Sequence, residues 1–167
     1  PTLGAIRLGG SEVATLVSTL AGSGGTQGYA DGVGGTARFK GMNGLALSSD
    51  GSILYVSDRY NHRIRKVITA TGVVTTLAGS GSAGSADGAA ASASFNEPAG
   101  LALTSDGALL YVAGNQDGKI RKVSTSSGAV SSLASISRSY GVALTSDGAY
   151  LYASSDTDHK IYRLATS

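Results

Sequence analysis

Short apolar runs separated by polar clusters recur along most of the chain. Each run is rich in β-branched, aromatic and leucine residues, and each is bounded by Gly, Asp or Ser. Runs of this length with these boundaries predict antiparallel β-strands. In the first complete set of runs, we expect strands at about 44–48, 53–57, 63–67 and 73–78.

This set of runs is repeated. Three segments, which begin at Gly44, Gly100 and Gly141, align with one another without a gap. Each opens with an apolar run, passes through Ser-Asp-Gly, reaches a second run centred on a tyrosine and then enters a cation-rich run. A four-stranded unit of about 40 residues that recurs in this way is typical of a β-propeller blade. The sequence therefore predicts an all-β propeller of four-stranded antiparallel blades.

An Asp-Gly pair follows the opening run of every repeat. Such a pair predicts a tight hairpin turn, because Gly tolerates the positive φ that these turns demand. We therefore expect the first two strands of each blade to be direct neighbours. The pairs are Asp50-Gly51, Asp106-Gly107 and Asp147-Gly148.

Two long linkers connect the repeats, at 20–44 and 77–100, and they are related copies. Both carry Ala-Gly-Ser-Gly, then Asp-Gly, then a phenylalanine, whereas the third linker at 133–141 is much shorter. Long surface linkers are tolerated because loop-closure entropy grows slowly with length. We expect Phe39 and Phe95, the only phenylalanines, each to fill apolar space beside its blade.

The repeats divide the chain into about three blades of a propeller. Residues 1–22 are expected to form the outer strands of a preceding blade, because Ile6–Leu8 resembles the end of a third strand and 13–22 resembles a fourth. Complete blades are expected at 40–79 and 97–135, and an incomplete one at 139–167. Three blades do not close a ring, since propellers need about four to eight.

Two arrangements would close the ring. In the first, the chain is a segment of a longer protein that holds the other blades, which the lack of an initiator Met favours. In the second, two copies pair head to tail about a two-fold axis into six blades. Each N-terminal strand would then complete the partner's last blade. The expected partners are accordingly other protein chains, other blades of the parent protein or a second copy.

The repeats closely resemble the NHL repeat family. The resemblance lies in "PAGLALTSDGALLYV…GKIRKV", which recurs with "TLAGSG…ADG…SF" linkers over nearly the whole chain. It implies a propeller, usually of six blades, that mostly binds proteins, RNA or glycans. A minority of related propellers are enzymes, among them an amidating lyase with a His-bound metal. Similar Ala-Gly-Ser-Gly linkers occur in large extracellular proteins, which implies an extracellular or cell-surface location.

Composition excludes several classes of site and partner. Gly accounts for 25 of the 167 residues and Pro for only 2, which favours many tight turns. The chain has no cysteine, so disulfides and thiolate metal sites are excluded. A formal net charge of +2 is too small to argue for nucleic acid. No apolar run approaches the roughly 20 residues that span a bilayer, so membrane insertion is not expected.

The pair Asn61-His62 lies among cations and could belong to a site or to a turn. At the aligned positions the other repeats carry Asp117-Gly118 and Asp158-His159. All three pairs suit a turn, since Asn and Asp tolerate the left-handed region and Gly adopts it freely. Catalytic zinc normally has three protein ligands, and two histidines two blades apart fall short of that number. The sequence therefore favours a turn, with no metal or cofactor.

A cation-rich run recurs at the outer part of each blade. One interpretation is a basic stripe that binds phosphates or acidic glycans. The other is an outer strand that charge keeps soluble and protects from edge pairing, which we favour because carboxylates lie nearby. The candidate ligand-binding residues are Arg63, Arg65, Lys66, Lys119, Arg121 and Lys122.

No catalytic set converges in the sequence. Asp31, Asp87, Asp156 and Asp158 could suggest calcium, but the ordered ligand loop is missing, so turns are the better interpretation. We find no nucleophile elbow and no phosphate-binding loop. We therefore expect a non-enzymatic interaction or structural module of a larger assembly. The alternatives are an RNA or acidic-glycan binder that uses the basic strands, and a lyase-type enzyme.

Overall fold

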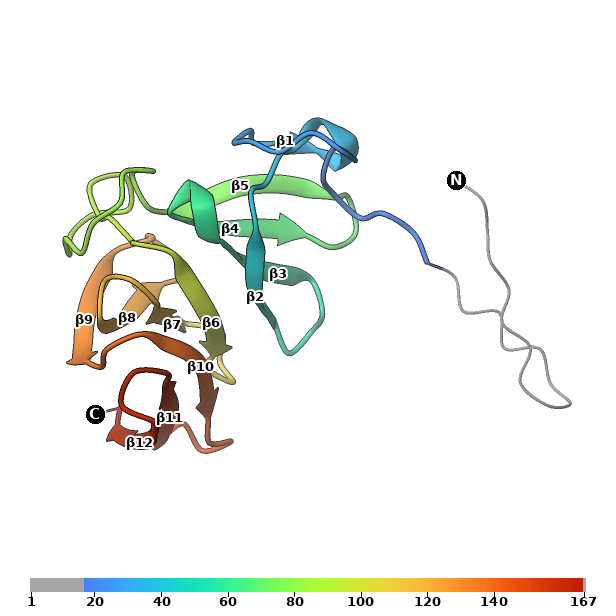
Figure 1. Cartoon of the computed structure of the whole chain (residues 1–167). Coiled ribbons are helices and arrows are strands. Elements are labelled where there is room, and N and C mark those ends of the chain that lie inside the picture. The colour runs from blue at the N-terminus through green and yellow to red at the C-terminus, as the bar shows by residue number, and fades with distance from the viewer. Residues whose placement is uncertain (1–16, 167) are drawn as a thin grey trace, which may run out of the picture.

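The computed structural model describes residues 17–166 and shows a nearly all-β protein (Figure 1). The strand expected at Ile6–Leu8 lies outside the described residues, and residues 17–22 form no strand. Two short 3-10 helices, η1 (Gly34–Thr36) and η2 (Arg59–Asn61), are the only helical elements described.

The strands form three antiparallel sheets, which we number as blades. The expected all-β fold, with about three blades, is confirmed. The first blade holds β2 (Met42–Leu47), β3 (Ile53–Asp58), β4 (Arg63–Ile68) and β5 (Val73–Ala78), with β1 (Gly32–Val33) added to β5. The second holds β6 (Pro98–Leu103), β7 (Leu109–Gly114), β8 (Lys119–Ser124) and β9 (Val130–Ser135). The third holds only β10 (Ser139–Leu144), β11 (Tyr150–Ser155) and β12 (Lys160–Ala165).

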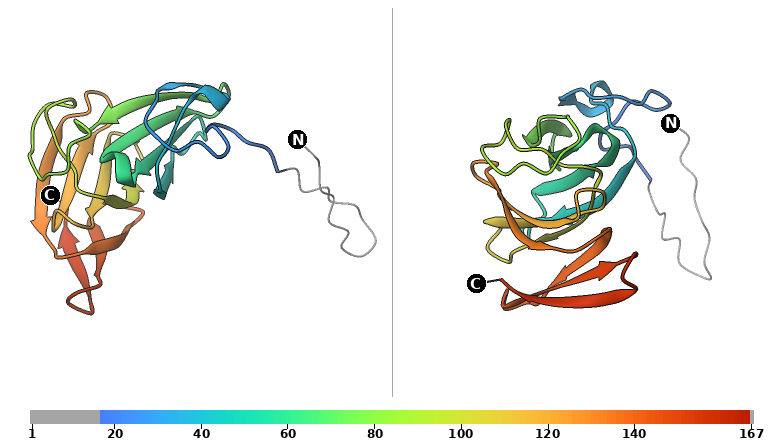
Figure 2. Two further views of the ribbon diagram at one scale, coloured as in Figure 1. Left: turned by 45° about the horizontal axis from the view of Figure 1, so that its top comes forward. Right: turned by 60° about the vertical axis from the view of Figure 1, so that its left-hand side comes forward.

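The blades follow one another around an arc, as Figures 1 and 2 show. Their first strands pack side by side, β2 against β6 and β6 against β10. Glycine permits this approach, because a Cβ on Gly44 would overlap the carbonyl oxygen of Ala99, and one on Gly100 would overlap that of Tyr140. The glycines that open the first two repeats are therefore contact points between neighbouring blades.

The hydrophobic core lies between the blades. Tyr55 of the first blade packs with Leu101 and Val112 of the second. Phe95 joins the same cluster, and Phe39 belongs to a cluster on the other side of the first blade. Both phenylalanines are buried, which confirms that each linker fills apolar space beside its blade.

The hairpin turns also form as expected. Gly51, Gly107 and Gly148 adopt φ values of 72°, 71° and 73°, in the left-handed region that favours glycine. They connect the first two strands of each blade, which pair in the sheet.

Candidate functional site

Arg65 of the first blade lies in a buried network that joins the blade to its linker. Its Nη1 donates to Oδ2 of Asp58 at 2.7 Å, and both side chains are fully buried. Its Nη2 donates to Oδ1 of Asp31 at 2.6 Å and to the carbonyl oxygen of Ala30 at 2.8 Å. Asp31 also accepts the backbone N–H of Thr76 on β5. The guanidinium therefore holds the first linker against the outer strands.

Arg121 repeats this network in the second blade. Its Nη2 donates to Oδ1 of Asp87 at 2.6 Å and to the carbonyl oxygen of Ala86 at 2.8 Å. Its Nη1 donates to Oδ2 of Asp117 at 3.2 Å. Asp87 accepts the N–H of Ser132 on β9, as Asp31 does from β5. Both long linkers are thus fastened by an arginine and an aspartate of the same kind.

The buried carboxylate comes from a different position in each of the two blades. Asp58 ends β3, whereas Asp117 lies in the turn between β7 and β8. Glycine stands in the second blade where the first has Asp58, and a Cβ on this Gly114 would overlap the Asp117 carboxylate. In the first blade, Asn61 occupies the turn position and its Nδ2 donates to both Asp58 oxygens at 2.9 Å. A buried carboxylate therefore lies beside the guanidinium in both blades, although it comes from the end of β3 in the first blade and from the β7–β8 turn in the second.

The third blade uses a phenol in place of the guanidinium. Tyr162 aligns with Arg65 and Arg121, and its hydroxyl donates to Oδ2 of Asp158 at 2.9 Å. The linker before this blade is short and carries no Asp-Gly pair. The arginine thus occurs only in the blades that have a long linker to hold.

The acidic partners of Arg121 differ in their pKa because their surroundings differ. Burial raises the pKa of Asp117 and outweighs the hydrogen bonds from Lys119 and Arg121. Burial also raises the pKa of Asp87, but hydrogen bonds from Ser132 and Arg121 outweigh it and lower the net value. The linker carboxylate is therefore the more readily ionised partner.

These contacts correct the expectation of a solvated basic strand. Arg65 and Arg121 are fully buried, so neither is open to a ligand. Arg63 donates to the carbonyl oxygens of Asn61 and Ser80, and Lys119 donates to that of Ser85. Of the six candidate residues, only Lys66 and Lys122 make no side-chain hydrogen bond with the described residues. The six side chains do not form one free cationic surface.

The histidines lie in turns, which confirms that interpretation. His62 and His159 both have φ of 53°, and Gly118 at the aligned position has φ of 66°. Nδ1 of His62 accepts the backbone N–H of Glu97 at 3.2 Å. Within residues 17–166, no three His, Cys, Asp or Glu side chains are grouped so that they could hold a metal ion.

The pKa of His62 predicts a pH-dependent stability. Burial lowers this pKa below the usual 6.5, although the Glu97 carboxylate works against the change. As pH falls through 6.5, the unfolded chain therefore binds a proton before the folded chain does, and stability is lost. Urea unfolding at pH 7 and pH 5 should show that His62→Gly reduces this loss. His159→Gly, at the matched turn, should retain it, and equal loss in both variants would contradict the assignment.

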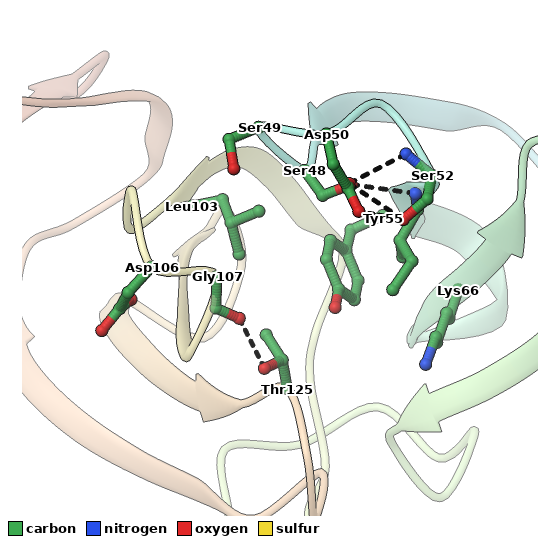
Figure 3. A pocket seen from close by; sticks show the side chains of 11 residues that line it. Ser48, Ser49, Asp50, Ser52, Tyr55, Lys66, Leu103, Asp106, Gly107 and Thr125 are labelled. Atoms are coloured by element: carbon green, nitrogen blue, oxygen red, sulfur yellow. Dashed lines mark hydrogen bonds between the residues drawn. The ribbon is translucent and has the colours of Figure 1, made fainter.

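A polar cleft of about 310 Å³ lies between the first and second blades (Figure 3). The β2–β3 and β6–β7 turns line it, together with Tyr55, Lys66 and Thr125. Its two carboxylates are bound within their own turns: Oδ1 of Asp50 accepts from Ser48 Oγ at 2.6 Å, and Asp106 accepts from Thr104.

The ionisable groups of this cleft do not form a catalytic set. The hydrogen bonds from Ser48 and Ser52 lower the pKa of Asp50 to about 2, so this carboxylate cannot donate a proton near neutral pH. Burial raises the pKa of Tyr55, so its phenol keeps its proton. The hydroxyl of Ser48 lies beside the Asp50 carboxylate, but a carboxylate of such low pKa is a weak general base for it.

Apolar surface is exposed at both ends of the arc. A hollow of about 180 Å³ on the first blade is lined by Leu20, Phe39 and Leu45, among others. A shallower one of about 240 Å³ on the third blade is lined by Val142, Tyr152 and other residues. Apolar faces of this kind mark interaction surfaces. They are therefore candidate sites for a partner of the described chain.

Asp31 and Asp87 bind the buried arginines, although their Asp-Gly pairs predict only turns. Each lies 34 residues before the arginine that it binds. The third repeat lacks the linker aspartate and the arginine together. The linker aspartate and the strand arginine thus occur together in two repeats and are both absent from the third, which is a signal in the sequence that they interact.

Two curated relatives place the chain among known proteins. No protein-family model matches it. Protein SUPPRESSOR OF QUENCHING 1, chloroplastic, of Arabidopsis thaliana is 41% identical over 103 residues, 62% of this chain and 10% of that protein. NHL repeat-containing protein 2 of Bos taurus is 39% identical over 105 residues, 62% of this chain and 14% of that protein. The resemblance to NHL repeat proteins is confirmed, and the chain spans only a small part of these relatives.

Solved structures support the fold. A protein of unknown function from Bacteroides thetaiotaomicron superposes with a TM-score of 0.68 over 89% of this chain and 34% of its own. At 22% sequence identity, this likeness concerns the fold alone. None of the helices described in the chain is long and apolar enough to cross a membrane.

Proposed function

We propose that this chain, built of NHL-type repeats, is a non-enzymatic interaction scaffold within a larger extracellular or cell-surface assembly. It would hold other protein chains or other blades through the two end faces of its arc. The observation that carries this proposal is the exposure of large apolar side chains on both faces. They are Met42, Leu45 and Leu47 on the first blade, and Tyr150, Tyr152 and Ile161 on the third.

The polar groups of the chain support a structural role. The carboxylates of the inter-blade cleft bind their own turns, and the buried arginines fasten linkers. His62 serves a turn in which the second blade has Gly118. Burial of Arg65 and Arg121 also removes two of the six cations on which RNA or acidic-glycan binding would depend.

Zinc content and turnover test the non-enzymatic part of this proposal. We expect the purified chain to hold no stoichiometric zinc and to show no turnover with lyase or hydrolase substrates, because no three ligands are grouped in residues 17–166. Metal analysis and activity assays of the wild type and His62→Ala check this. Turnover that His62→Ala abolishes, while His159→Ala retains it, would overturn the scaffold proposal.

A further inference from the structure

We propose that the partner at the end faces is a second copy of this chain. Residues 17–21 of one copy add to β12 of the other as the missing fourth strand, and the two apolar end faces pack together. This inference rests on the scaffold function and names its partner. This contact between an end face of one copy and the opposite end face of the other would occur twice, related by a two-fold axis.

Residues 17–22 already lie where an outer strand ends. The sequence Ala21–Gly24 repeats Ala78–Gly81, which follows β5. The N–H of Gly22 donates to the carbonyl oxygen of Gly34 at 3.0 Å, and that of Gly79 donates to Ala90 at 2.9 Å. Ser23 and Ser80 continue this match, with bonds to Ala37 and Ala93. Residues 17–22 therefore enter the first blade as the end of β5 enters the second.

The described residues place no strand beside residues 17–21 at their own end of the arc. β5 pairs with β4 and β9 with β8, but β12 is an edge strand of the described sheet. In Figures 1 and 2, residues 17–22 and β12 lie at opposite ends of the arc, so one copy does not bring them together. The pairs Val74–Val67 and Val130–Val123 set the register. They place Val17 opposite Leu164 of the second copy.

Exposure changes sharply between equivalent positions. Val17 is 87% exposed, whereas Val74 and Val130 are 1% and 4% exposed. Ile161 is 79% exposed, whereas Ile64 and Ile120 are fully buried. Positions that complete blades bury are thus open where the described residues place no strand or blade beside them.

The two end faces are the two halves of an interface that the chain already forms. Tyr55 of the first blade receives Leu101 of the second, and these residues are 3% and 8% exposed. Their equivalents, Tyr152 on the third blade and Leu45 on the first, are 40% and 59% exposed. The third blade therefore exposes the face that in the first blade packs against its neighbour through Tyr55. The first blade exposes the face that in the second packs through Leu101.

Gly141 supports the same partner. Gly44 and Gly100 are required by the backbone of the next blade, whose carbonyl oxygens a Cβ would overlap. At Gly141 the nearest described atom to such a Cβ is the flexible Oγ of Ser154, at 3.2 Å. The third blade thus carries the glycine of a blade junction without a described neighbour. The first blade of a second copy would be that neighbour.

In a dimer, both apolar end faces of each arc would be covered. A head-to-tail contact repeats until its rotation closes, and a two-fold axis closes it with two copies. The ring would then hold about six blades, within the usual four to eight. Each β12 edge and each 17–21 segment would be used once, so the third blade would have four strands, as the second has.

Light scattering on a sizing column tests the association of the 167-residue chain. We expect a mass twice the 16.5 kDa of one chain. Val17→Asp and Ile161→Asp should each raise the dissociation constant at least about 100-fold, because a buried charge without a partner is costly. Circular dichroism checks that these exposed substitutions leave the fold intact. Ser126→Asp, at an exposed position of the β8–β9 turn in the middle blade, is the control.

Cross-linking tests the strand register directly, since the chain has no cysteine of its own. Ser18→Cys and Arg163→Cys chains, mixed and oxidised, should form a disulfide-linked pair, because the equivalent Thr75 and Lys66 are Cα partners. Ser18→Cys chains oxidised alone should not, and nor should Arg163→Cys chains.

Four outcomes would overturn the proposal: a monomer, an open series of larger assemblies, a dimer that both aspartate variants leave intact, or a mixture that does not cross-link. A monomer without catalytic turnover would remove the second copy as partner and leave the scaffold proposal standing.

Discussion

Replacement of Asp58 with alanine is expected to lower the free energy of unfolding by about 3–5 kcal/mol. Asp58 and Arg65 are both fully buried, and their charges lie 2.7 Å apart. Without Asp58, the one carboxylate that the described residues leave to the guanidinium is that of Asp31, which is partly exposed. The N–H of Lys40 and Nδ2 of Asn61 would lose an acceptor at the same time. Urea unfolding at pH 7 measures the change.

Asp50→Ala is the matched control for this substitution. Asp50 is also a hydrogen-bonded aspartate of the first blade, but it lies exposed in the β2–β3 turn. We expect it to cost less than about 1 kcal/mol, as surface substitutions usually do. A second substitution, Arg65→Met, should recover part of the loss in Asp58→Ala, because an apolar side chain can replace a buried charge. Equal losses in Asp58→Ala and Asp50→Ala would contradict the proposed role of the network.

The turn around His62 could be predicted from the sequence because its requirement is local. Three aligned pairs, Asn-His, Asp-Gly and Asp-His, share only a tolerance for the left-handed region. The structure places His62, Gly118 and His159 in that region. Comparison of the repeats shows that the position requires a left-handed backbone and not an imidazole, because the second repeat has Gly118 there.

The burial of Arg65 could not be predicted in the same way. A cation on an outer strand normally faces solvent, and here a linker folds back to cover it. Ile64 and Arg65 are adjacent and both buried, and the register of β4 with β5 shifts between them. The simple alternation of a strand therefore misassigns this side chain. Which face is covered depends on a partner 34 residues away, which strand periodicity does not reveal.

The end faces show the same limit at a larger scale. Leu45 and Tyr152 have the pattern of any blade, but that pattern does not say whether they are buried. Whether they are depends on what stands beside the blade, and the described chain leaves them exposed. The local sequence pattern thus predicts the strands of each blade, but it does not predict which neighbour covers the end faces.

Phe95→Ala is expected to lower the free energy of unfolding by about 3–5 kcal/mol, the usual cost of removing a buried phenylalanine. Phe95 is fully buried between the first two blades, and its ring lies 5.4 Å from the Arg121 guanidinium, centroid to Cζ. The substitution would therefore open a cavity next to a buried charge. Urea unfolding of the Val17→Asp chain measures this, so that association does not contribute.

Phe39→Ala provides the comparison, because Phe39 holds the equivalent place in the first linker. Its ring lines the open hollow on the first blade, where solvent can fill the space that a smaller side chain leaves. We expect a loss of about 1–3 kcal/mol, below that of Phe95→Ala, since no closed cavity forms. If Phe39→Ala cost as much as Phe95→Ala, the first blade would have a neighbour on that side even without the second copy. The order of these two losses therefore reports whether the outer face of the first blade is covered.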